Sequence, residues 1–311
     1  MRMVLMGTGT SHGIPVIGCS CKVCRSHNPK DKRLRCSVYI TQMEKDGTET
    51  HLVIDTGPEF RIQALQYHIT ALNAVLITHS HADHLNGLDD LRIFSHTESE
   101  GTGRCCVPMM KYAESPGQGL PVYSNTFALN DIRNRFDYIF KTTQAGGGKP
   151  KLDLEDCARF SADSPLFVGS IRIIPVPMRH GCIDTTGWLL STTDINGMTH
   201  SIAYLTDCNE IPSGSISLLR QAGGIIDHVV IDGLRETVHS THFSYLEAMK
   251  YAAEIGGKCT WLTHICHNMC HKDIIKYCRV HVNDFPELVK IVKKGGSILP
   301  AYDGLVLKSG E

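Results

Sequence analysis

One short segment constrains the fold more than any other part of the 311-residue chain. Residues 78–84 read Thr-His-Ser-His-Ala-Asp-His, and they directly follow the apolar run at 74–77. That run predicts a buried strand, and α/β sheets place their sites at the carboxyl ends of such strands. His79 and His81 can therefore point at one metal ion, while Asp83 and His84, entering the next helix, can point at a second. Core packing offers no comparable reason for three His and one Asp in six positions.

The composition is that of a globular protein and narrows the function classes. The chain has 31 Lys and Arg against 32 Asp and Glu, so no global basic field favours a general nucleic-acid binder. No apolar run is long enough to predict a membrane span, and the run before Gly7 is too short for a signal peptide. We therefore expect a cytoplasmic protein, whose 13 Cys bind metal or pack in the core rather than form a disulfide framework.

Apolar, β-branched runs alternate with helical patterns along the chain. Buried strands are predicted at 37–42, 51–55, 74–78, 171–176, 202–206, 229–231 and 259–263, and helices at 60–67, 216–221, 245–255 and 285–293. This is the order of an α/β fold, and we expect one domain over residues 1–311. The stretch from about 97 to 163 is rich in Gly, Pro, Ser, Thr and Asn, and it is interpreted as an insertion or lid region.

The segment at 78–84 resembles the HxHxDH signature of the metallo-β-lactamase superfamily, and the resemblance continues in order along the chain. Met-Arg-His-Gly at 178–181 resembles the third ligand segment of that family. Residues 203–207 resemble the segment with a bridging Asp, and residues 261–264 the last ligand strand. Residues 54–57 read Ile-Asp-Thr-Gly, and Asp55 matches the family's Asp at a strand end, which supports the metal ligands without binding the metal. The resemblance implies an αββα sandwich of two mixed β-sheets flanked by helices.

The same resemblance implies a dinuclear metal centre. The first ion would be held by His79, His81 and His180, the second by Asp83, His84 and His264, and Asp207 would bridge them. A catalytic site of this kind keeps an open position for solvent or substrate. Ligation by His and Asp without thiolate suits Zn(II), Mn(II) or Fe(II), and the sequence does not choose among them. Oxygen-reducing relatives carry Glu at the position of His81, so hydrolysis is favoured over redox chemistry.

A second cluster lies in the sequence Cys19-Ser-Cys21-Lys-Val-Cys24. Three thiolates need a fourth ligand to close a tetrahedral zinc site. His267, three residues after His264, is our candidate, and Cys266, Cys270 and His271 remain alternatives. Such a structural zinc would pin the N-terminal loop to the rim of the active site.

The N-terminal segment at 7–15, Gly-Thr-Gly-Thr-Ser-His-Gly-Ile-Pro, followed by CxCxxC, resembles the PhnP-like branch of the superfamily. That branch hydrolyses cyclic phosphodiesters and carries a structural zinc on CxCxxC plus His, here matching Cys19, Cys21, Cys24 and His267. The resemblance implies a metal-bridging hydroxide that attacks a small phosphodiester or nucleotide-like substrate, with Asp83 and Asp207 in the catalytic centre.

The branch also implies a general acid. His242 lies 22 positions before His264, where the branch has a His that gives a proton to the leaving oxygen. A second interpretation remains open, in which His242 is only a neighbour of Ser244 at a helix N-cap. A homodimer is compatible with this fold, although nothing in the sequence supports one.

Three rival functions remain in view. A tRNA-processing nuclease of the same superfamily predicts a basic surface or arm, for which Lys141, Lys149 and Lys151 are too few. A thioester hydrolase of the glyoxalase II type is disfavoured by the CxCxxC cluster. A non-catalytic binding protein would resemble the relatives in pyrroloquinoline quinone biosynthesis, which share that cluster. The complete set of seven metal ligands favours catalysis.

Overall fold

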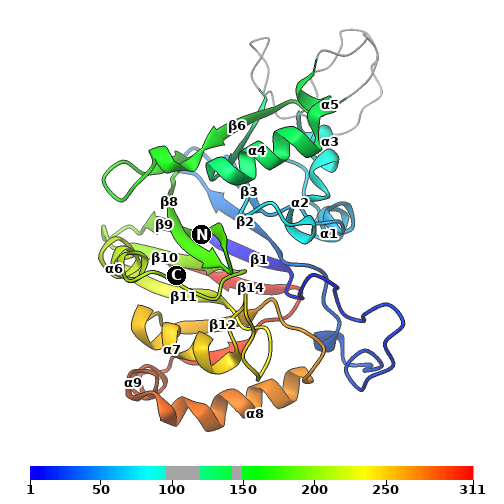
Figure 1. Cartoon of the computed structure of the whole chain (residues 1–311). Helices are drawn as coiled ribbons and strands as arrows, with labels where there is room; N and C mark the ends of the chain where they lie inside the picture. The colour runs from blue at the N-terminus through cyan, green and yellow to red at the C-terminus, as the bar shows by residue number, and fades with distance from the viewer. Residues whose placement is uncertain (96–118, 142–148, 311) are drawn as a thin grey trace.

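The computed structural model describes residues 1–95, 119–141 and 149–310. Within these residues the chain forms two mixed seven-stranded sheets, with helices on both outer sides (Figure 1). The predicted αββα sandwich is therefore confirmed. Among the described residues, no helix combines the length and the apolar character that crossing a bilayer requires.

The first sheet has the strand order β14-β1-β2-β3-β4-β5-β6. Its strands are β1 (Arg2–Gly7), β2 (Ser37–Met43), β3 (Glu49–Ile54), β4 (Ala74–Leu76), β5 (Leu120–Ser124), β6 (Leu152–Asp156) and β14 (Leu305–Lys308). The helices associated with it are α1 (Phe60–Gln66), α2 (Ala82–Leu85), α3 (Arg92–Ser95), α4 (Thr126–Arg135) and α5 (Asp137–Phe140). Strands β3 to β6 run parallel, so their carboxyl ends meet at one edge.

The second sheet has the order β13-β12-β11-β10-β9-β8-β7. Its strands are β7 (Leu166–Val168), β8 (Ile171–His180), β9 (Ile183–Thr193), β10 (Thr199–Leu205), β11 (Ile225–Asp232), β12 (Cys259–Thr263) and β13 (Ser297–Pro300). The helices associated with it are α6 (Ser213–Ala222), α7 (Tyr245–Ile255), α8 (His271–His281) and α9 (Pro286–Lys293). Strands β10 to β13 are parallel, so their carboxyl ends also lie together. They lie beside the carboxyl ends of the parallel strands of the first sheet.

Three apolar layers hold the sandwich together. Between the sheets, Trp188 and Tyr204 of the second pack with Met3 and Ile54 of the first, and all four are fully buried. A second layer joins the second sheet to α6–α9, and a third joins the first sheet to α1, α2 and α4. Burial of apolar area on both faces of each sheet provides the main driving force for this architecture.

The predicted insertion at about 97–163 differs from the structure over part of its length. β5 and β6 extend the first sheet, and α4 buries Leu129 and Ile132 against it. These residues therefore belong to the sandwich and are not a lid added to it. The remainder, 96–118 and 142–148, lies outside the described residues. A single domain over residues 1–311 stays a prediction.

Candidate metal centres

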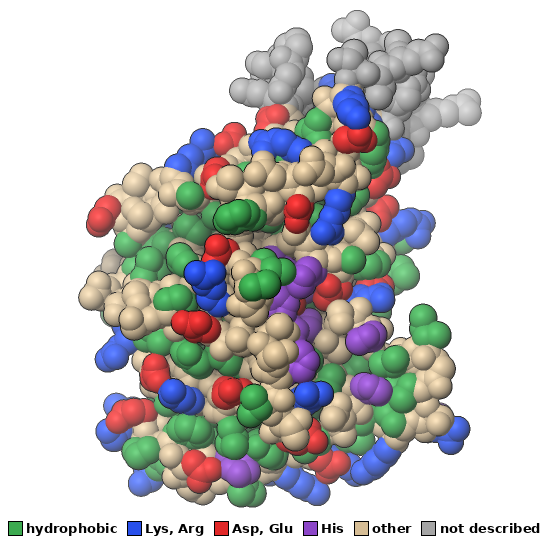
Figure 2. All heavy atoms as spheres, in the orientation of Figure 1, with side chains coloured by type: hydrophobic (Ala, Val, Ile, Leu, Met, Phe, Trp, Pro, Cys, Tyr) green, Lys and Arg blue, Asp and Glu red, His purple; other side chains and the backbone are tan. Residues whose placement is uncertain are grey.

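The strand ends bring the predicted donor residues to one edge of the sandwich. His79 follows β4, His180 ends β8, Asp207 follows β10, and His264 follows β12. Figure 2 shows histidine side chains gathered near the middle of one face. Residues spread over nearly two hundred positions therefore share one site, because parallel strands place their carboxyl ends side by side.

The first donor group consists of His79, His81 and His180, which each offer a ligand atom within 4.8 Å of the others. The ring centroids of His79 and His81 lie 4.5 Å apart, and His180 lies 5.3 Å from the first and 5.1 Å from the second. Nδ1 of His180 donates to the carbonyl oxygen of Thr241 at 2.6 Å. This hydrogen bond directs the other ring nitrogen, Nε2, toward the site.

The second donor group consists of Asp83, His84, Asp207 and His264. Oδ2 of Asp207 lies 3.1 Å from Nε2 of His84, and its Oδ1 lies 3.3 Å from Nε2 of His264. The same carboxylate reaches the first group, since Oδ2 lies 3.7 Å from Nε2 of His79. Asp207 therefore stands between the two groups, where a bridging ligand must stand.

The donor atoms fit divalent metal ions. Nε2 of His79, His84 and His264 is buried in each case and has no hydrogen-bond partner among the described residues. Buried polar atoms without partners are rare and costly, and metal coordination accounts for them. Burial alone would raise the pKa of Asp207, but His264 and His84 hold it well below its ordinary value. An ionised carboxylate among unpartnered imidazole nitrogens is a donor set for a divalent cation.

Asp55, predicted as a supporting residue, orients one of these donors. Its Oδ2 accepts a hydrogen bond from Nδ1 of His84 at 2.7 Å, and its Oδ1 accepts from the backbone N–H of Thr78 at 2.8 Å. The carboxylate therefore fixes the tautomer of His84 so that Nε2 is free to bind metal.

The backbone at this edge is unusual. Asp55, Asp207 and His264 have φ values of 64°, 54° and 56°, in the left-handed region that residues with a Cβ seldom occupy. Asp55 and His264 directly follow β3 and β12, and Asp207 comes two residues after the end of β10, so the left-handed turn beyond each strand points the side chain into the site. Such strain clusters at functional sites.

His242 lies between the two donor groups. Its ring centroid is 4.6 Å from that of His180 and 4.5 Å from that of His264. Nδ1 donates to Oδ2 of Asp232 at 2.7 Å. Burial alone would lower the pKa of His242, but the Asp232 carboxylate outweighs it and raises this pKa to about 9. His242 therefore lies beside both donor groups, with its ring oriented and its pKa raised by Asp232.

Sequence reasoning missed Asp232. The signal was present, because Asp232 follows an apolar run and ends β11, as Asp55 and Asp207 follow β3 and β10. The predicted helix cap is present as well: Oγ of Ser244 accepts from the backbone N–H of Glu247, and the Glu247 carboxylate accepts from that of Ser244. The cap and the acid role of His242 are compatible, since the cap holds the loop that presents the ring.

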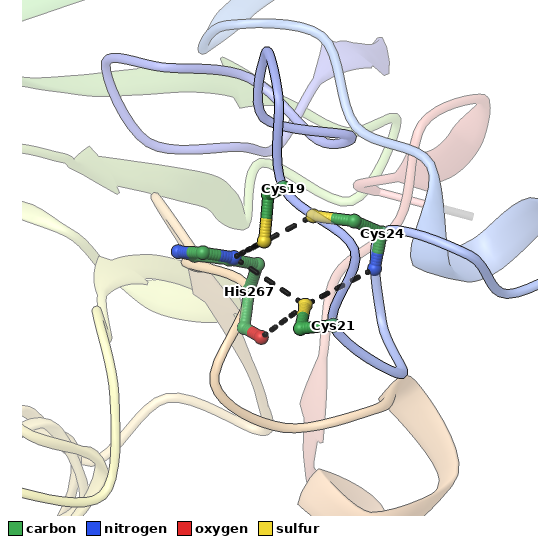
Figure 3. A group of neighbouring side chains, drawn as sticks. All are labelled: Cys19, Cys21, Cys24 and His267. Carbon is green, nitrogen blue, oxygen red and sulfur yellow. Dashed lines mark hydrogen bonds between the residues drawn. The ribbon is translucent and has the colours of Figure 1, made fainter.

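A separate site joins the N-terminal loop to the segment before α8. Figure 3 shows Cys19, Cys21, Cys24 and His267 pointing toward one another. Nδ1 of His267 lies 3.4, 3.5 and 3.5 Å from the three Sγ atoms in that order. Zn–S and Zn–N bonds of about 2.3 and 2.0 Å in a tetrahedron require an S···N distance of about 3.5 Å, so the four side chains fit a structural zinc.

The three alternative ligands have other partners. Cys266 donates from Sγ to Oδ1 of Asn268 at 3.0 Å, and Cys270 packs in a small apolar cluster with Ile14 and Val23. Nδ1 of His271 lies 3.3 Å from a guanidinium nitrogen of the buried Arg33. Cys270 also packs against Cys24, but among these residues only His267 places a donor atom within 4.8 Å of the three thiols. The backbone of Ile265 also pairs with the N-terminal loop, at Thr8 and Thr10, beside the donor His264.

Comparisons with known proteins agree with this geometry. A family model described as the beta-lactamase superfamily domain matches residues 50–265. The crystal structure of a diphosphatase from the PhnP family superposes with a TM-score of 0.73 and 30% identity, covering 99% of this chain and 97% of that one. The chain belongs to the metallo-β-lactamase family, in its PhnP-like branch, and most members of this family are hydrolases. The resemblance stated from the sequence is therefore confirmed.

Two curated relatives carry other names. An octanoyltransferase of Porphyromonas gingivalis is 31% identical over 99% of this chain, but the match covers only 55% of that protein. The chain thus spans about half the length of this relative. A coenzyme PQQ synthesis protein B of Methylorubrum extorquens is 26% identical over 67% of this chain and 85% of that protein.

Proposed function

We propose that the protein is a metal-dependent phosphodiesterase that hydrolyses small, cyclic or nucleotide-like phosphodiesters. One observation carries the proposal: the His242–Asp232 pair lies between two complete groups of metal donors. A proton donor at that place serves a reaction in which an oxygen leaves from a metal-bound centre. The similarity to a PhnP-family diphosphatase supports cleavage of a bond between phosphorus and oxygen.

The donor groups define the metal ligands of this proposal. His79, His81 and His180 would hold one ion, Asp83, His84 and His264 would hold the other, and Asp207, which lies between the two groups, would be shared by both. Divalent ions such as Zn(II), Mn(II) or Fe(II) would supply an activated water and neutralise charge on the phosphoryl oxygens. The protein holds seven donors in place before substrate arrives, and this preorganisation lowers the cost of reaching the transition state.

The chain's own acid acts on the leaving group. Asp232 keeps the ring of His242 oriented and protonated, so that Nε2 carries a proton toward the oxygen that departs. An alkoxide is a poor leaving group in water, and its protonation contributes about 10²–10⁴-fold to the rate.

The cysteine cluster has a structural role in this proposal. A zinc ion on Cys19, Cys21, Cys24 and His267 joins the N-terminal loop to the segment that follows His264. Thiolates that bind zinc must stay reduced, which is consistent with a cytoplasmic location.

A panel of cyclic and linear phosphodiesters, given to protein of measured metal content, tests the proposal. We expect turnover of cyclic nucleotides and of bis-p-nitrophenyl phosphate, and we expect Asp207→Ala to abolish it and to lower the metal content. Asp163→Ala, at an exposed position away from the donors, is the matched control and should keep full activity. Metal-loaded protein that is inert on every phosphodiester would instead favour a binding protein, and selective cleavage of precursor tRNA would favour the nuclease.

A further inference from the structure

A cavity of about 330 Å³ opens beside the first donor group. It is lined by His79 and Ser80, by Phe127 and Asp131 of α4, and by Cys182 and Asp184 of the β8–β9 hairpin. This volume is at the lower end of the range for small-molecule pockets, about 300–1,000 Å³. A larger cavity, of about 450 Å³, lies between α1 and α3, but no predicted metal ligand lines it.

Helix α4 is fastened to the loop that carries the metal donors. Oγ of Ser80 donates to Oδ2 of Asp131 at 2.5 Å, and Nη1 of Arg135 donates to the carbonyl oxygen of Ser80. Asn125 caps the helix and donates from Nδ2 to Thr186 Oγ1 of β9 at 3.2 Å. The helix therefore holds a fixed position relative to His79 and His81.

The face that α4 turns toward the cavity carries one aromatic ring. Phe127 and Asp131 are four positions apart, so they lie on the same side of the helix. Phe127 is 67% exposed although it lines a pocket that reaches a metal donor. A single exposed Phe needs no explanation elsewhere on a surface, but this ring borders a pocket that contains a metal donor, and exposed aromatic rings can stack on bases.

The charged residues of the cavity limit which chemical groups of a ligand can bind beside the Phe127 ring. Asp131 and Asp184 both line the cavity, and each has an arginine partner: Arg179 lies 2.8 Å from Asp184, and Arg135 lies 3.9 Å from Oδ2 of Asp131. Oδ1 of Asp131 accepts no hydrogen bond from the described part of the chain, so it remains available as an acceptor. Carboxylate oxygens accept hydrogen bonds and donate none, so this lining favours a ligand with N–H or O–H donors. An aromatic ring that carries N–H or O–H donors can both stack on Phe127 and donate to the carboxylates.

We propose that this cavity binds the nucleobase of a nucleotide-like substrate, with Phe127 stacking on the base and Asp131 accepting from its exocyclic N–H. The inference rests on the proposed phosphodiesterase function and gives that function a preference for substrates with an aromatic base. The phosphodiester then lies at the donor groups and the base lies between α4 and the β8–β9 turn.

Two substrates with the same reacting group test the proposal by kinetics. Adenosine 2′,3′-cyclic phosphate carries a base, and glycerol 1,2-cyclic phosphate does not. Phe127→Ala should lower kcat/KM on the adenosine substrate by about 5- to 150-fold, as expected for one stacked base, and mainly through KM. Its activity on the glycerol substrate should stay within about twofold, since the metal donors are untouched.

Two further variants complete the comparison. Phe127→Tyr keeps the aromatic ring and should restore activity on the adenosine substrate. Phe167→Ala removes another exposed aromatic ring, 60% exposed on β7, and should change neither activity. Equal losses on both substrates, or no loss on either, would overturn the proposal.

A binding measurement separates this inference from the proposed function. Adenosine, which has no phosphate, should slow the alkylation of the exposed Cys182 by iodoacetamide in wild-type protein and not in Phe127→Ala. If adenosine protects Cys182 in wild-type protein but the protein hydrolyses neither cyclic phosphate, the proposed function is wrong and the subsite stands. If wild type hydrolyses both and adenosine gives no protection, the subsite is wrong and the function stands.

Discussion

Nδ1 of His242 lies 2.7 Å from Oδ2 of Asp232, and this contact joins the loop before α7 to the end of β11. The same carboxylate oxygen accepts from the backbone N–H of Cys208 at 3.2 Å, and Asp232 is fully buried. A buried carboxylate held from two sides can fix an imidazole ring with little loss of entropy on binding. The ring of His242 is therefore oriented before any substrate arrives.

His242→Ala should slow substrates according to their leaving groups. Esters with alkoxide leaving groups should lose about 10²–10⁴-fold in kcat, because they need the proton that His242 gives. p-Nitrophenyl esters should lose much less, since p-nitrophenolate leaves without a proton. Steady-state kinetics on both kinds of substrate measure the difference, and equal losses in kcat would show that His242 is not the general acid. Ser244→Ala is the control: it should cost about 1 kcal/mol in stability through the lost cap and leave this dependence unchanged.

Asp232→Asn should change the pH dependence in a defined direction. The carboxylate raises the pKa of His242 to about 9 against the opposing effect of burial, so its removal lets burial lower that pKa. The acid is active when protonated, and its contribution is lost as the pH rises through its pKa. The alkaline limb of kcat/KM, measured with an alkoxide leaving group, should therefore move to lower pH. An alkaline limb that stays in place would show that another group is the acid.

Asp55→Asn should weaken metal binding without removing a ligand. The carboxylate accepts from Nδ1 of His84 and from Thr78, and a neutral amide at this position no longer enforces the same tautomer. Loss of such support lowers metal affinity by about 10–100-fold. Titration with a competing chelator measures this change, with Asp163→Asn as an exposed control. Unchanged affinity would mean that His84 is oriented by its other neighbours.

Cys21→Ser should remove about one zinc ion per chain and lower Tm by roughly 5–10 °C. The backbone N–H of Cys24 and the ring of His267 outweigh burial and lower the pKa of Cys21 to about 6. Since the thiolate is the ligand, protons compete with zinc for the sulfur atoms, so zinc should be retained at neutral pH and released on acidification. Elemental analysis and thermal melts report both effects. Cys182→Ser, at an exposed thiol, should leave zinc content and Tm as they are in wild type.

Much of the fold could be predicted because buried strands and amphipathic helices carry regular apolar patterns. β10 and β12 were found from such runs, and a donor residue follows each within two positions. β6 was missed because its alternating Leu and acidic residues lie among Gly, Pro and Ser, in a composition typical of loops. A half-buried strand at the end of a sheet needs only every second residue to be apolar, so composition concealed its regular structure.

The donor groups could be predicted because their spacing is local within each segment and their order along the chain is that of a known family. Asp232 could not be assigned in this way, since its partner His242 lies ten residues further on and belongs to an irregular loop. The carbonyl of Thr241, which orients His180, has no sequence signal at all, because any residue supplies a backbone carbonyl.

The left-handed backbone at Asp55, Asp207 and His264 has a consequence for evolution of the chain in the laboratory. A residue with a Cβ costs about 1–2 kcal/mol in that conformation, whereas glycine adopts it freely. Replacement of Asp207 by glycine would thus relieve the backbone and remove the carboxylate between the two donor groups. Bound metal stabilises the native state, so it is in metal-free protein that a screen for heat resistance alone would favour loss of the centre, and activity must be selected alongside it.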